Sequence, residues 1–167
     1  MSEWRYELNL SQVPDDWAGR NRRYPHLRMF RLADVIQEPD TPLQLYELVR
    51  EGVLHTPGHD GTFETYDTFL DRIYETSYFN HAQTQYLAAD GEDWIALSSV
   101  QVQEEEGVCG LTTVRPSHRR QGIATALKSW AIADCRNRGM ARLVTRIHEK
   151  NVAMRMVNER LGFRRIG

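Results

Sequence analysis

The stretch from Val114 to Leu127 constrains the fold of this 167-residue chain more than any other. An apolar strand pattern leads into a short basic loop, and a helix begins around Gly122. The first amides of a helix lack partners and lie at its positive end. Gly122 and the small Ala124 leave that backbone accessible, while Arg119 adds positive charge. This pattern predicts a cradle for a pyrophosphate, with a capped helix after a basic turn as the alternative.

Two common nucleotide-binding signatures are missing from the sequence. There is no Gly-x-x-x-x-Gly-Lys-Ser/Thr and no Gly-x-Gly-x-x-Gly after a strand, which argues against NTP hydrolysis and dinucleotide hydride transfer. The net charge is −2, from 21 basic and 23 acidic residues, so no global positive field draws the chain to nucleic acid. The arginine run 20–23 invites a nucleic-acid reading, but Asp15 and Asp16 offset it and favour a solvated linker.

The remaining pattern predicts one domain of strands and helices, because the length fits a single domain and the apolar spacing alternates between the two types. The expected strands are 4–10, 27–32, 83–88, 94–102, 108–114, 142–147 and one from 163. The expected helices are one capped by Thr41 with Pro42 in its first turn, one over 65–76, one from Gly122 to Gly139, and one from Asn151 to Gly162. Turns at Asp90-Gly91 and 104–107 predict an antiparallel meander. On the helix after Gly122, Asp134 is expected at the edge of the apolar stripe.

Two motifs resemble the GNAT superfamily of N-acetyltransferases. Arg119-Arg-Gln-Gly-Ile-Ala124 resembles its Gln/Arg-x-x-Gly-x-Gly/Ala signature, and the segment 151–163 resembles its later helix with the Leu-Gly-Phe ending. The close match covers about residues 108–165. The resemblance implies an α/β (α+β) fold, the GNAT acyl-CoA acyltransferase fold, with a mixed, mostly antiparallel sheet flanked by helices on both faces.

The same resemblance implies acetyl-CoA (CoA) as the cofactor. Strand 108–114 is expected to separate from strand 142–147, and the cofactor is expected to fill the gap between them. The residues expected to hold it are Thr112, Thr113, Val114, Arg119, Arg120, Gln121, Gly122, Ile123, Ala124, Thr125, Asn151 and Asn158. Asn151 also fits a helix cap, and Asn158 also fits a solvated position.

The implied activity is N-acetyltransfer from acetyl-CoA to a primary amine of a small molecule or peptide, directly in a ternary complex. In many members of the superfamily, a tyrosine that serves as the general acid stands where this chain has Asn158. An asparagine cannot donate a proton productively. No catalytic residue is therefore assigned, and a non-catalytic acyl-CoA-binding module is the alternative. His55, His59 and Asp60 are the candidate substrate-binding residues, and no metal site is expected.

The N-terminal strand is the unusual feature of the predicted order. The family fold usually finishes with two strands, whereas only one short strand follows Phe163 here. We therefore divide the chain into a strand and linker, residues 1–25, and an acetyltransferase domain, residues 26–167. The strand is expected to supply the last strand of the sheet, within its own chain or exchanged in a homodimer.

The two cysteines and the absence of an apolar leader predict a cytoplasmic protein with reduced thiols. The expected partner is the amine substrate, with neither nucleic acid nor membrane.

Overall fold

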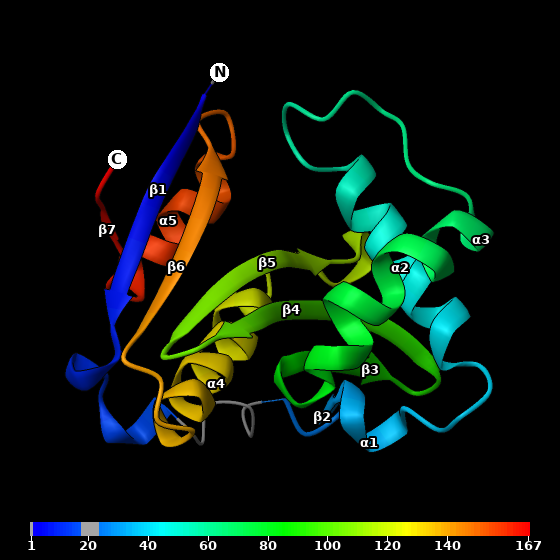
Figure 1. Cartoon of the computed structure of the whole chain (residues 1–167), viewed down its shortest axis with the longest axis horizontal. Helices are drawn as coiled ribbons and strands as arrows, with labels where there is room; N and C mark the ends of the chain where they lie inside the picture. Colours follow the sequence, from blue (N-terminus) through cyan, green and yellow to red (C-terminus); the bar gives the residue numbers. More distant parts are fainter. Residues whose placement is uncertain (1, 18–23) are drawn as a thin grey trace.

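The computed structural model describes residues 2–17 and 24–167, and the arginine run 20–23 lies outside them. Its centre is a seven-stranded sheet in the order β2-β3-β4-β5-β6-β1-β7 (Figure 1). All neighbouring strands are antiparallel except the parallel pair β5 and β6. The predicted mixed, mostly antiparallel sheet is thus confirmed. None of the described helices is long and apolar enough to cross a membrane.

The elements follow the predicted order with shifted ends. The strands are β1 Glu3–Asn9, β2 Arg28–Arg31, β3 Gln85–Asp90, β4 Asp93–Gln103, β5 Glu106–Val114, β6 Arg142–His148 and β7 Arg164–Arg165. The α-helices are α1 Leu32–Val35, α2 Thr41–Leu54, α3 Tyr66–Phe69, α4 Ile123–Asn137 and α5 Val152–Arg160. The short helical segments are η1 Leu10–Gln12, η3 Leu70–Tyr78, η4 Phe79–Thr84 and η5 Pro116–His118.

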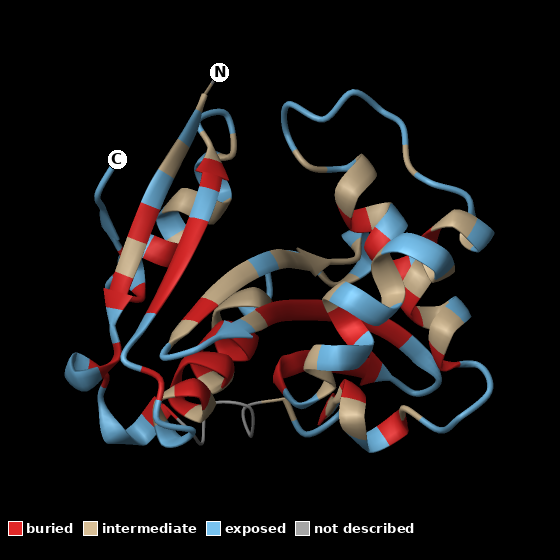
Figure 2. Ribbon diagram, in the orientation of Figure 1, coloured by how far each residue is buried: buried red, intermediate tan, exposed pale blue. Residues whose placement is uncertain are grey.

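Helices cover both faces of the sheet because neighbouring strand residues point to opposite sides. In β3, Tyr86 joins a core that includes Leu127 of α4. The next residue, Leu87, joins a second core that includes Leu48 of α2. Figure 2 shows long buried stretches in β4, β6 and α4, where the sheet meets the helices that cover it. The sheet therefore separates an α4–α5 side from an α2–α3 side.

Strands β5 and β6 pair only at their first residues, from Glu106 with Arg142 to Val108 with Val144. Beyond that point they diverge, as Figure 1 shows. β6 is paired along its other edge with β1 throughout, from Glu3 opposite His148 to Asn9 opposite Arg142. The early end of the parallel ladder leaves the later part of β5 with one open edge.

Strand β1 lies between β6 and β7 of its own chain. Tyr6 and Leu8 are buried and belong to the α4-side core, as the alternation in the sequence predicts. Beyond the short β7 ladder, the amide of Arg5 donates a hydrogen bond to the carbonyl of Gly167 at 2.9 Å. Exchange of this strand between two copies, and the homodimer it would make, stay predictions, as does the division at residue 25.

Several local expectations differ from the structure. Thr41 does not cap α2: it is the first helical residue, and its hydroxyl donates to the carbonyl of Val35 at 2.6 Å. The helix expected over 65–76 is a short α3 followed by the π-helical η3, which runs on to Tyr78. The ring of Tyr78 lies 6.0 Å from that of Phe69. Asp134 lies at the edge of the apolar stripe, as expected, although its side chain is only 14% exposed.

Candidate functional site

The first turn of α4 presents free backbone donors. No described residue accepts a hydrogen bond from the amides of Ile123, Ala124 or Thr125, and Gly122 caps the helix without a side-chain bond. No acidic residue lies in this first turn. Because the positive end of the helix dipole coincides with these donors, the position favours an anion.

Gly122 is required by the backbone as well as by the open space. Its φ is +77°, a conformation that residues with a Cβ adopt only with strain. An added Cβ would also lie 2.9 Å from the Tyr24 hydroxyl. That hydroxyl donates to the carbonyl of Gln121 at 2.7 Å and so fixes the loop before the helix.

The basic loop is held by its own side chains. Arg119 Nε donates to the carbonyl of Val114 at 3.0 Å, which ties the loop back to the end of β5. Arg120 has a φ of +63°, and a non-glycine residue in this region marks a backbone held in an unfavoured conformation. His118 contacts Ser117 Oγ at 2.7 Å through Nδ1 and Asp90 at 2.8 Å through Nε2, which fixes the loop to the β3–β4 turn.

A cavity of about 520 Å³ runs between this loop, the open edge of β5, the end of α2 and the start of α5. All but two of the predicted cofactor-binding residues line it, from Thr112 on β5 to Asn151 before α5. Between them lies the start of α4, residues 122–125, which we call the α4 cradle. The exceptions are Gln121, whose carbonyl binds Tyr24, and Asn158. The structure thus gathers residues from three separate parts of the sequence around one cavity.

The two asparagines of α5 behave differently. Asn151 caps the helix, since its side chain accepts from the amide of Met154 at 3.3 Å, and it also lines the cavity. The solvated position that we considered for Asn158 is wrong, because this residue is 1% exposed. Its Nδ2 donates to the carbonyl of Met154 at 2.9 Å, while its Oδ1 is enclosed without a partner.

The three candidate substrate residues are separated. His55, directly after α2, lines the cavity. His59 and Asp60 line a different depression, with Val53 and Phe63. Their side chains bind the loop itself, because His59 Nδ1 accepts from the amide of Gly61 and Asp60 Oδ1 accepts from Thr62. Those bonds to Thr62 lower the pKa of Asp60.

Sequence reasoning missed the contribution of α2 to the cavity. Gly52, Thr56 and Pro57 line it together with His55. Gly52 was a readable signal, because a glycine inside a helix costs about 0.5–1 kcal/mol and marks a close approach. A Cβ there would lie 2.7 Å from the side chain of Thr113, so the missing side chain lets α2 approach β5.

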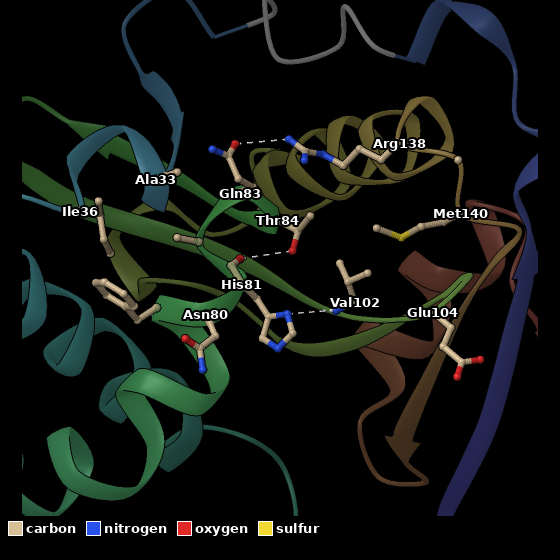
Figure 3. Close-up of a pocket in the computed structure, with 13 residues that line it drawn as sticks. Ala33, Ile36, Asn80, His81, Gln83, Thr84, Val102, Glu104, Arg138 and Met140 are labelled. Atoms are coloured by element: carbon tan, nitrogen blue, oxygen red, sulfur yellow. Dashed lines mark hydrogen bonds between the residues drawn. The ribbon is translucent and has the colours of Figure 1, made fainter.

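A second cavity, of about 460 Å³, shares no lining residue with the first. It lies between α1, η4, the β4–β5 turn and the end of α4 (Figure 3). His81, which lines this second cavity, accepts a hydrogen bond at Nδ1 from the amide of Val102 at 3.2 Å. None of the predicted site residues reaches this cavity.

The cysteines offer no reactive thiol. Burial raises the pKa of the Cys135 thiol to about 12, and it also raises the pKa of Cys109. A nucleophilic cysteine needs a lowered pKa, so neither residue fits that chemistry. Among the described residues, no three His, Cys, Asp or Glu side chains are grouped to hold a metal ion.

The fold and the α4 cradle define the class of the protein. Residues 45–163 match the model of the acetyltransferase (GNAT) family. The chain therefore belongs to the acetyltransferase (GNAT) family. No curated protein sequence matches it significantly.

Similar solved structures show the same fold. A GCN5-related N-acetyltransferase from Sphaerobacter thermophilus has a TM-score of 0.75 at 19% identity, over 99% of this chain and 48% of that one. The ribosomal-protein-S18-alanine N-acetyltransferase from Escherichia coli has a TM-score of 0.63 at 20% identity, over 84% of this chain and 79% of that one. YncA from Salmonella typhimurium, in a structure with its cofactor acetyl-CoA, has a TM-score of 0.63 at 17% identity, over 83% of this chain and 80% of that one. The chain thus spans about half the length of the Sphaerobacter protein.

Proposed function

We propose that this chain transfers an acetyl group from acetyl-CoA to a primary amine of a small molecule or peptide, in a ternary complex. The single observation that carries the proposal is the α4 cradle, with three free amides opening into the cavity. The residues fit a pyrophosphate on two counts. Free donors meet it at the helix start, and a Cβ at Gly122 would close the approach. Bound acetyl-CoA or CoA in related structures supports the same donor.

Each part of the cavity has a role in this proposal. The α4 amides, with Arg119 and Arg120, bind the pyrophosphate, and the open edge of β5 binds the pantetheine amides. Acetyl-CoA supplies an acyl group activated as a thioester. The β5 ladder with β4 is irregular between Cys109 and Thr112, where three steps in β5 face two in β4. Such bulges re-aim backbone groups, so an amide of this bulge is the proposed donor to the acyl oxygen.

A non-catalytic acyl-CoA-binding module is the second candidate, and Asn158 favours it. This amide occupies the position that resembles the family's tyrosine, and an amide has no proton to give at neutral pH. Binding alone does not separate the two candidates. Release of CoA with a panel of small amines and peptides does, since turnover supports the enzyme and binding without turnover supports the module.

The cradle itself is tested by Gly122→Gln against Gly139→Gln. The two glycines lie at opposite ends of α4, with φ of +77° and +88°, so both variants carry similar backbone strain. Only the Gly122 variant puts a side chain into the cavity. We expect it to lose CoA binding in calorimetry, while the Gly139 variant keeps the affinity of the wild type. Equal CoA affinity in both variants would contradict the cradle.

The predicted homodimer and cytoplasmic location belong to the same proposal. Native mass spectrometry of mixed isotope-labelled chains would detect the homodimer.

A further inference from the structure

Lys128 is a buried lysine without a counter-charge in the described part of the chain. The residue is 3% exposed, and no hydrogen bond or ion pair with residues 2–17 or 24–167 includes its Nζ. Its nearest recorded partner is the ring of Phe163, with Nζ 5.5 Å from the ring centroid. Burying an ammonium without an anion is costly, so an aromatic face alone does not account for this lysine.

Lys128 does not itself line the cavity, but it lies one turn of α4 beyond residues that do. It follows Ala124 and Thr125, which line the cavity, by four and three residues, and so lies on the same face of the helix. Lys128 Nζ has no hydrogen-bond partner in the described part of the chain, but unlike Asn158 Oδ1 it keeps some solvent-accessible area. The small exposed area of Lys128 therefore includes the ammonium.

Cys109 places this charge near the point where the sheet opens. It is the first residue of β5 after Val108, the last one paired with β6. Burial raises the pKa of the Cys109 thiol, and the ammonium of Lys128 acts in the opposite direction. The Lys128 ammonium therefore lies close enough to the start of the β5–β6 opening to lower the pKa of the Cys109 thiol.

The facing helix α5 contributes a second incompletely paired group. Asn158 is bound to the carbonyl of Met154, and Met154 lines the cavity. Its enclosed Oδ1 accepts nothing, and its amide cannot replace an acid. Of Lys128 on α4 and Asn158 on α5, only Lys128 is able to balance a negative charge.

We propose that the ammonium of Lys128 is the counter-charge for the thiolate of CoA. The inference rests on the proposed function. In that reaction the amine nitrogen forms a bond to the acyl carbon, and the carbon–sulfur bond breaks. The electron pair of that bond stays on sulfur, and the amine proton goes to solvent. Lys128 lowers the energy of the departing thiolate by its charge and keeps its own proton, so no acid is needed at Asn158.

A measurement on the unaltered chain tests the proposal without an acceptor. Affinities for CoA and for desulfo-CoA, which lacks the sulfur, are compared by calorimetry across the thiol titration, near pH 8.5 for an ordinary thiol. A cation within about 4–6 Å typically lowers an acidic pKa by 1–3 units. The preference for CoA over desulfo-CoA should therefore rise about tenfold or more between pH 5 and pH 9.5.

Variants then assign the effect to Lys128. Lys128→Met removes the charge at similar length, and Lys128→Arg keeps it. The exposed Lys150, the only other lysine in the sequence, gives the control Lys150→Met. We expect the ultraviolet absorbance of bound thiolate to titrate at least one pH unit higher in Lys128→Met, with Lys128→Arg and the control near the wild type. Turnover should fall roughly 100-fold in Lys128→Met, with little change in KM for acetyl-CoA.

The outcomes separate this inference from the proposed function. If neither CoA nor desulfo-CoA binds, the proposed function fails and this inference fails with it. If both bind and their ratio does not change with pH, the function stands and the role of Lys128 is overturned. Should Lys128→Met not fold, as judged by circular dichroism, an unchanged ratio of the two ligands on the wild type still overturns the role of Lys128.

Discussion

Asp134 joins α4 to two strands, and its replacement by alanine measures how firmly the helix is held on the sheet. Its Oδ1 accepts from Arg31 of β2 at 2.6 Å. Its Oδ2 accepts from the Tyr86 hydroxyl of β3 at 2.6 Å and from Arg138 at 2.8 Å. With 14% of its side chain exposed, this carboxylate is a mostly buried acceptor for three donors.

Each of the three donors loses its acceptor in Asp134→Ala, and each loss lowers the free energy of unfolding. Tyr86 is 0% exposed, and a buried hydroxyl without its acceptor costs about 1–3 kcal/mol. Arg31 and Arg138 have side chains 27% and 34% exposed, so solvent screening limits each pair to about 0.5–1 kcal/mol. We expect Asp134→Ala to lower the free energy of unfolding by about 3 kcal/mol. For a chain of this length that corresponds to a fall in Tm of roughly 6–12 °C.

Urea unfolding followed by tryptophan fluorescence gives the measurement. Asp71→Ala is the matched control, because Asp71 is exposed on η3 and should change stability by less than about 0.5 kcal/mol. Tyr86→Phe combined with Asp134→Ala should cost less than the two single changes added together, since the pair shares one bond. A loss in Asp134→Ala no larger than in the control would refute the assigned role.

Two further outcomes are expected. Burial alone would raise the pKa of Asp134, but hydrogen bonds from Tyr86, Arg138 and Arg31 outweigh it and leave the pKa lowered. The stabilisation by Asp134 is therefore complete above the ordinary carboxyl pKa and is lost as pH falls through the lowered value. The gap in stability between wild type and Asp134→Asn should accordingly shrink in acid urea titrations and stay constant at neutral pH. Separately, Tyr24→Phe removes the 2.7 Å bond to the loop before α4 and should weaken CoA binding roughly two- to tenfold in calorimetry, with Tyr66→Phe as control.

The parts of the fold that the sequence predicted depend on local patterns. The α4 cradle is readable because a strand, a basic loop and a glycine follow one another within a few residues. The alternation of Tyr6 and Leu8 likewise predicts a half-buried strand, and both side chains are buried. The capping of α5 by Asn151 is equally local, since donor and acceptor are three residues apart.

The parts that the sequence did not predict depend on distant partners. Asp134 lies at the edge of its apolar stripe, but the sequence does not show its partners, because Arg31 and Tyr86 lie 103 and 48 residues away. Thr41 reads as a cap, but its hydroxyl has the carbonyl of Val35 as a better-placed partner. Asn158 reads as solvated, because nothing in the sequence shows that α5 turns this position towards the core.

The opening between β5 and β6 depends on the strand farthest away in the sequence. After Val144, the backbone groups on the β5 side of β6 lose their strand partner, and this edge faces the opening. β1 pairs with the opposite edge along the whole of β6, from Glu3 to Asn9, and so keeps β6 in the sheet. The end of β6 is therefore hydrogen-bonded on the β1 side while its β5 side stays open. The N-terminal strand, which shares no residue with the α4 cradle, thus holds in place the strand that forms one side of the opening.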